Sequence, residues 1–135
     1  MRDQHPHGAK FESWRKYFLA KPGVEERHPF DPDLPVYFAG KKMFAIYSQD
    51  GGESSMNLKC FPDWSVELRK EYKAIEPGYH MNKKHWNTVT LDGSVPRALL
   101  KRLVDCSYDL VTGKIKKMLV KEGAVIKPKK KALKQ

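Results

Sequence analysis

One segment, from Gly78 to Pro96, constrains the fold of this chain more than any other. It reads GYHMNKKHWNTVTLDGSVP. Apolar and polar side chains alternate from Asn87 to Leu91, which is the pattern of a strand with one solvated face. Asp92-Gly93 then marks a turn, and apolar residues at helical spacing begin soon afterwards. A chain that passes from turn to strand to helix over so short a distance is expected to combine strands and helices in one unit.

The other elements follow from the same kinds of pattern. Aromatic residues at helical spacing from Phe11 to Phe18 predict a first helix over about 9–20. Short runs rich in β-forming residues predict three strands, at 36–38, 43–47 and 56–60. Pro62 favours the start of a second helix, and Ser94 is the expected N-cap of a last helix over about 95–112. The charged stretch 25–35, which holds three prolines, is expected to be a surface connection.

The expected order is therefore α-β-β-β-α-β-β-α. Strands in runs, joined by short turns, favour an antiparallel sheet with helices on one face, which is an α+β fold. The other face of the sheet is then left to solvent or to a partner. We expect a single domain over residues 1–113 and a basic C-terminal extension over 114–135, helical at first and then frayed.

The positive charge of the chain is concentrated at its C-terminal end. The formal net charge is +10, and residues 114–135 carry nine lysines and one glutamate. A lysine run of this kind attracts polyanions whatever their sequence, although it is also an ordinary solubilising end. Two cysteines, Cys60 and Cys106, without CxxC spacing favour small buried thiols in a reducing compartment. With no long apolar run, we expect a cytoplasmic monomer that contacts no membrane.

Several segments of the chain together resemble the MmcQ/YjbR family of small bacterial proteins. They are LAKPGVE at 19–25, GKKMFA at 40–45, NLKC at 57–60, PGYHMNKKHWN at 77–87, LDG at 91–93 and SYDLV at 107–111. The resemblance runs from about Phe11 to Val111. It implies a CyaY/frataxin-like α+β fold with a double-wing arrangement, a DNA-binding role and no agreed catalytic centre. Phe61 departs from the acidic cap expected before Pro62.

The segment that carries the sharpest resemblance also offers the candidate binding surface. Lys83, Lys84 and His85 precede Trp86, which by strand alternation shares a face with Thr88 and Thr90. Ammonium groups suit phosphates, and an indole suits base stacking. We therefore predict a mainly electrostatic, weakly sequence-selective contact with DNA or another nucleic acid. The predicted contact residues are Lys41, Lys42, Lys59, His80, Asn82, Lys83, Lys84, His85 and Trp86.

Two other interpretations remain open. In one, Trp86 closes the core and the lysines only keep an edge strand from pairing with a second molecule. In the other, the open sheet face, with Trp86 and Tyr47, binds an acidic protein or a small ligand. We expect no enzyme and no cofactor, because a nucleophile such as Ser107 or Cys106 would need a histidine within reach, and both lie in a predicted helix whose apolar face is core. We expect no metal either. The iron-binding acidic ridge of the frataxin fold has no counterpart in this chain, and His80 and His85, five residues apart, do not have the spacing of a ligand pair on a helix.

Overall fold

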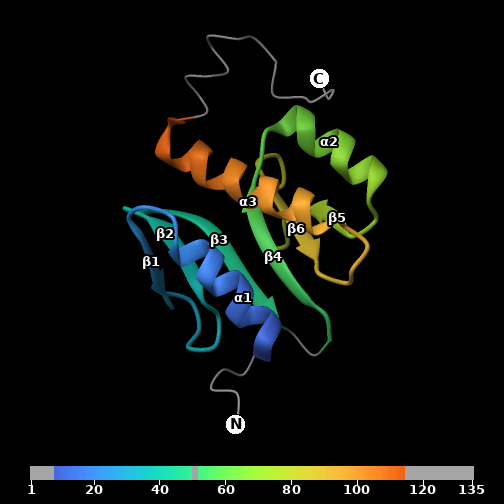
Figure 1. Cartoon of the computed structure of the whole chain (residues 1–135). Helices are drawn as coiled ribbons and strands as arrows, with labels where there is room; N and C mark the ends of the chain where they lie inside the picture. The colour runs from blue at the N-terminus through green and yellow to red at the C-terminus, as the bar shows by residue number, and fades with distance from the viewer. Residues whose placement is uncertain (1–7, 50–51, 115–135) are drawn as a thin grey trace.

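The protein is a six-stranded antiparallel sheet with three helices on one face (Figure 1). The computed structural model describes residues 8–49 and 52–114. The strand order is β1-β2-β3-β4-β6-β5. The strands are β1 Val24–Arg27, β2 Val36–Ala39, β3 Lys42–Gln49, β4 Ser54–Lys59, β5 Ile75–Pro77 and β6 Trp86–Thr90, and the helices are α1 Gly8–Leu19, α2 Pro62–Glu71 and α3 Arg97–Thr112. The predicted α+β class is confirmed.

The sheet contains one strand more than the sequence predicts. Strand β1 overlaps the start of the stretch 25–35, which was expected to be a connection, and it pairs with β2 from Val24↔Ala39 to Arg27↔Val36. Its sequence, VEER, has one apolar residue, so no alternation of apolar and polar side chains marks it. Glu26 nevertheless turns its side chain toward the helices, where hydrogen bonds replace apolar contact. The observed order is α-β-β-β-β-α-β-β-α.

The core lies between the sheet and the helices. Phe11, Trp14 and Phe18 recur at helical spacing on α1 and are at most 2% exposed. The rings of Phe18 and Tyr37 lie 4.5 Å apart, and those of Phe11 and Tyr47 lie 5.1 Å apart. Tyr47 therefore faces the helices and not the open side of the sheet, which corrects the expectation that it lies on the open face.

Two helix starts differ from the expected capping. Helix α3 begins after Pro96, which makes no side-chain cap, and the expected N-cap Ser94 instead donates to Asp92 Oδ1 at 2.6 Å. Ser94 belongs to the turn and not to the helix, because Asp92 offers its oxygen two residues earlier. Helix α2 begins at Pro62, as predicted, and its N-cap residue Phe61 makes no side-chain hydrogen bond. The expected helical stretch after residue 114 lies outside the described residues.

A serine fixes α3 on the sheet. Ser107 Oγ donates to the carbonyl oxygen of Phe44 at 2.6 Å and accepts from the backbone N–H of Lys59 at 2.9 Å. The C-terminal half of α3 therefore lies where β3 begins and β4 ends (Figure 1). Gly113, with φ +82°, closes the helix in the left-handed conformation. Within the described residues, no helix is long and apolar enough to cross a membrane.

Candidate nucleic-acid interface

The register of the sheet gathers most of the predicted contact residues at one end. Lys41 lies in the turn between β2 and β3, Lys42 is the first residue of β3 and Lys59 is the last of β4. Lys59 pairs with Trp86, the first residue of β6, so the segment 78–85 that leads into β6 lies at the same end. We call the surface formed by five side chains there the basic end. They are Lys41, Lys42, Lys59, Lys83 and Lys84.

The lysines of the basic end have no acidic partners among the described residues. Four of the five are exposed, and Lys59 is half-buried. Elsewhere on the molecule, cations such as Arg15, Lys21 and Arg27 form ion pairs with carboxylates. No ion pair joins Asp63, an exposed acid in the first turn of α2, to any lysine of the described part of the chain. No ion pair within the described residues therefore neutralises the positive charge at this end.

The segment 78–85 is a structured loop that folds back on its own strand. Asn82 Oδ1 accepts hydrogen bonds from the backbone N–H groups of Lys84 and His85, at 3.0 and 3.2 Å. Lys83 Nζ donates across the loop to the carbonyl oxygen of Gly78 at 3.0 Å. The Asn82 oxygen is thus used to hold the loop together.

Arg69 joins the loop to α2, a role that the sequence analysis missed. Its guanidinium donates to Asn87 Oδ1 at 2.7 Å, to the carbonyl oxygen of Lys83 at 2.6 Å and to that of Trp86 at 3.2 Å. Asn87 is 2% exposed, and its amide also donates to Ser65 Oγ at 3.0 Å. The sequence indicates this role only through the i, i+4 spacing of Ser65 and Arg69, which places both side chains on one face of the predicted helix.

Trp86 is buried, which corrects the prediction that its indole is exposed for base stacking. The residue is 8% exposed, although it lies on the predicted face of the sheet, opposite Lys59. The loop covers it closely, because a Cβ atom at Gly78 would lie 2.8 Å from the Cβ of Trp86. Backbone hydrogen bonds from Gly78 N to Trp86 O and from Trp86 N to Asn82 O hold this arrangement, at 2.8 and 2.9 Å.

The exposed ring of the loop is Tyr79. It is 67% exposed, and its ring centroid lies 4.0 Å from that of His80. His80 is itself exposed and has a φ of +60°, the left-handed region that residues other than glycine seldom adopt. The contact residues predicted from the sequence include His80 but not Tyr79. The position of Tyr79 directly after Pro77-Gly78, in an expected turn, was the signal that could have found it.

Buried hydroxyl and thiol groups near this end are used in packing. The hydroxyl of Ser107 is occupied by its two backbone partners. Cys60 and Cys106 are 3% and 5% exposed, and a hydrogen bond to Cys60 together with burial raises the pKa of the Cys106 thiol. A buried thiol of raised pKa is a poor nucleophile. No cluster of three or more potential metal ligands occurs among residues 8–49 and 52–114.

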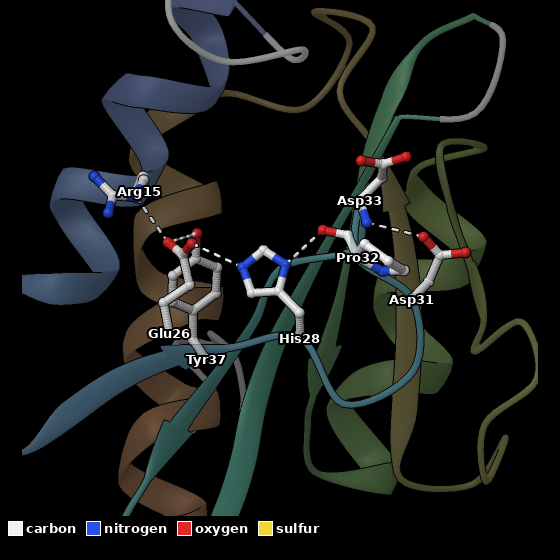
Figure 2. A network of polar contacts seen from close by, with 7 residues as sticks. All are labelled: Arg15, Glu26, His28, Asp31, Pro32, Asp33 and Tyr37. Carbon is white, nitrogen blue, oxygen red and sulfur yellow. Dashed lines mark hydrogen bonds and ion pairs between the residues drawn. The ribbon is translucent and has the colours of Figure 1, made fainter.

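A second polar cluster, shown in Figure 2, lies at the β1 edge of the sheet. Glu26 accepts from Arg15 Nε at 2.7 Å and from the Tyr37 hydroxyl at 2.9 Å, and His28 Nε2 lies 3.0 Å from its other oxygen. His28 Nδ1 in turn lies 2.8 Å from the carbonyl oxygen of Pro32. Burial alone would raise the pKa of Glu26, but the hydrogen bonds from His28, Arg15 and Tyr37 outweigh it and lower the pKa. With both oxygens occupied, this carboxylate holds β1 and the following loop in place.

Comparison with known proteins agrees with this architecture. The YjbR family model matches residues 19–110. The chain is 39% identical over 100 residues to YbdF, an uncharacterised protein of Escherichia coli O157:H7, covering 74% of this chain and 82% of that one. It is 34% identical over 93 residues to YjbR, an uncharacterised protein of Escherichia coli strain K12, covering 69% and 79%.

Solved structures give the same result. The crystal structure of Deinococcus radiodurans protein DR2400, whose domain is described as DUF419, is similar with a TM-score of 0.70 and 40% identity, covering 77% of this chain and 79% of that one. A Pseudomonas syringae protein is similar with a TM-score of 0.64 and 28% identity, covering 73% and 96%. The family match spans most of the chain and includes the loop and the five lysines of the basic end, whereas the lysine-rich sequence after residue 110 lies outside it. This chain therefore belongs to the YjbR family.

Proposed function

We propose that this protein is a non-enzymatic module that binds nucleic acid weakly and mainly through charge. The proposal depends on one observation, the basic end, where lysines from three separate parts of the chain meet without carboxylate partners among the described residues. A phosphate backbone is the partner that such a surface fits, because each ammonium group that meets a phosphate releases a condensed counterion.

The groups that read base sequence are scarce at this end. The donors of Arg69 and the oxygen of Asn82 are used inside the protein, and Asn87 is buried. Specific recognition needs Arg, Asn or Gln side chains aimed at base edges. We therefore expect affinity to depend steeply on salt and only slightly on the sequence of the nucleic acid.

We assign the lysine-rich C-terminal sequence an auxiliary role in this contact. Helix α3 ends beside the basic end, and residues 114–135, with nine lysines, follow it in the chain. The main contact is assigned to the lysines of the basic end, and an auxiliary contact to this C-terminal sequence. Replacing all nine lysines of the C-terminal sequence by glutamine separates the two contributions. Binding that disappeared in this variant would assign the contact to the C-terminal sequence alone.

The test is a titration of a labelled oligonucleotide by fluorescence anisotropy at several salt concentrations. Lys84→Ala should reduce the slope of log affinity against log salt by about one, and Lys41→Ala with Lys42→Ala by about two, since each lysine that meets a phosphate contributes about one unit. Lys73→Ala is the matched control, because Lys73 is exposed, forms no ion pair with the described residues and lies at the other end of β5. Slopes unchanged by the first two variants would exclude the basic end from the contact.

A further inference from the structure

We infer that Tyr79 and His80 form a stacking site for an unpaired base, so that the protein prefers single-stranded nucleic acid to duplex. The inference rests on the proposed nucleic-acid binding and adds to it the class of strand that is bound. It replaces Trp86, whose indole is buried, with a ring that the fold presents to solvent.

The exposure of Tyr79 is the first observation. Phe30, Val66 and Tyr79 are the exposed large hydrophobic residues of the described chain, and Tyr79 is the most exposed of them at 67%. Its ring lies against His80 at an interplanar angle of 49°, so two adjacent rings share the surface of one loop. Aromatic rings accept any base by stacking, because every base has a π-face.

The rigidity of the loop is the second observation. The backbone N–H of Tyr79 donates to Thr88 Oγ1 at 2.9 Å, and Gly78 on its other side bonds to Trp86 O at 2.8 Å. His80 is held at φ +60°, and strained conformations of this kind persist where the surrounding structure fixes them, often at binding sites. A backbone fixed in advance loses little conformational entropy when a ligand stacks on the rings that it carries.

The position of the rings relative to the charges is the third observation. Tyr79 and His80 lie in the same loop as Lys83 and Lys84. A backbone bound to these ammonium groups brings its own bases to the rings. In a duplex those bases are paired and stacked on one another, whereas an unpaired base can turn outward onto a side chain.

The experiment combines protein variants with three ligands of equal length and charge per strand. These are a mixed-sequence single strand, the same strand in a duplex, and the same strand with abasic sites. The full chain should bind the single strand more tightly than the abasic strand. Tyr79→Ala should weaken binding of the single strand by about fivefold or more, the loss typical of one stacked base, while changing duplex and abasic affinity by less than about twofold.

Two control variants identify the ring as the cause. Tyr79→Phe keeps the ring and should retain the preference for single strands. Phe30→Ala removes a ring that is 62% exposed in the loop between β1 and β2, at the far edge of the sheet, and should change nothing. Tyr79→Ala should also leave the salt slope unchanged, since stacking releases no counterions.

The outcomes separate the inference from the function on which it rests. If Tyr79→Ala lost the same affinity for the single strand and for the duplex, or lost affinity for neither, the stacking site would be overturned while the electrostatic proposal stood. The stacking site would also be overturned if the unsubstituted protein bound the duplex more tightly than the single strand. If the full chain bound none of the three ligands at low salt, both the proposed function and the stacking site would fall together.

Discussion

Gly78 shows how one residue determines the form of the loop. A Cβ atom at this position would lie 2.8 Å from the Cβ of Trp86 and 2.9 Å from that of Met81, closer than side chains ordinarily approach. Gly78→Ala should therefore destabilise the protein by about 1–3 kcal/mol, as overpacking does in other cores. The free energy of unfolding in urea measures the loss.

Gly52 provides the control for this substitution. A Cβ atom there meets nothing within 4 Å, and the residue is exposed. Gly52→Ala should leave the free energy of unfolding within about 0.5 kcal/mol of that of the parent protein. If both alanine variants unfolded at the same urea concentration, the close approach of the loop to Trp86 would be wrong.

Trp86 and Tyr79 illustrate what single residues reveal in a sequence. Strand alternation placed Trp86 on the correct face of the sheet, beside Thr88 and opposite Lys59. It gave no information on burial, because the loop covers Trp86 through backbone hydrogen bonds and the close approach of Gly78, which strand alternation does not describe. Tyr79 was overlooked for the same reason, since its exposure depends on how that loop folds.

At the scale of elements, Arg69 connects α2 to the loop and to β6. Its three hydrogen bonds end on Asn87, Lys83 and Trp86. Lysine carries the same charge but cannot donate in three fixed directions from a planar group. Arg69→Lys should therefore destabilise the fold by about 1–3 kcal/mol through partners left unsatisfied.

Urea unfolding measures this loss, and hydrogen exchange locates it. The amide protons of the loop should exchange faster in the variant, whereas those of β3, two strands away, should exchange at rates that follow global unfolding. Lys73→Ala, which alters an exposed side chain, serves as the control. Unchanged loop protection in Arg69→Lys would show that the guanidinium is not what holds the loop.

The Glu26 cluster gives β1 a stability that depends on pH. Hydrogen bonds lower the pKa of Glu26 below its ordinary value of 4.5. The stabilisation is therefore present above pH 4.5 and is lost as the pH falls through the lower pKa of the folded state. Glu26→Gln should cost about 1–3 kcal/mol at pH 7, and the difference from the parent protein should shrink in acid.

Urea unfolding of both proteins at pH 7 and below pH 4.5 checks this expectation. Glu25→Gln is the matched control, because Glu25 is next to Glu26 but its side chain is 67% exposed and pairs with Arg27 at the surface. Its effect should be within about 1 kcal/mol. A Glu26→Gln penalty that persisted unchanged in acid would mean that the carboxylate charge is not its source.

The elements were predictable to the extent that their apolar residues are periodic. Helices α1 and α3 follow from aromatic and aliphatic side chains at helical spacing, and β6 follows from alternation. Strand β1 was missed because hydrogen bonds to Glu26, and not apolar burial, hold its inward face. The start of α3 was misplaced because Pro96 begins the helix without the side-chain cap that Ser94 suggested.

At the scale of the whole molecule, the class of fold could be predicted from the sequence, but the position of the lysines at one end of the sheet could not. Runs of strands indicated an antiparallel sheet with helices on one face. Whether Lys42, Lys59 and Lys84 lie together depends on the order of the strands, in particular on β6 and not β5 lying beside β4. That order is decided by contacts between distant parts of the chain, such as Arg69 with Asn87.

The place where α3 ends has a consequence for how the two groups of lysines cooperate. Gly113 stops the helix next to the basic end, so the lysine-rich sequence is tethered beside the surface that it would assist. Under the proposed function, a polyanion bound by either group would meet the other at high effective concentration, and its avidity would exceed what the two attractions give separately. Weak contacts at each site are thereby compatible with long residence on an extended strand.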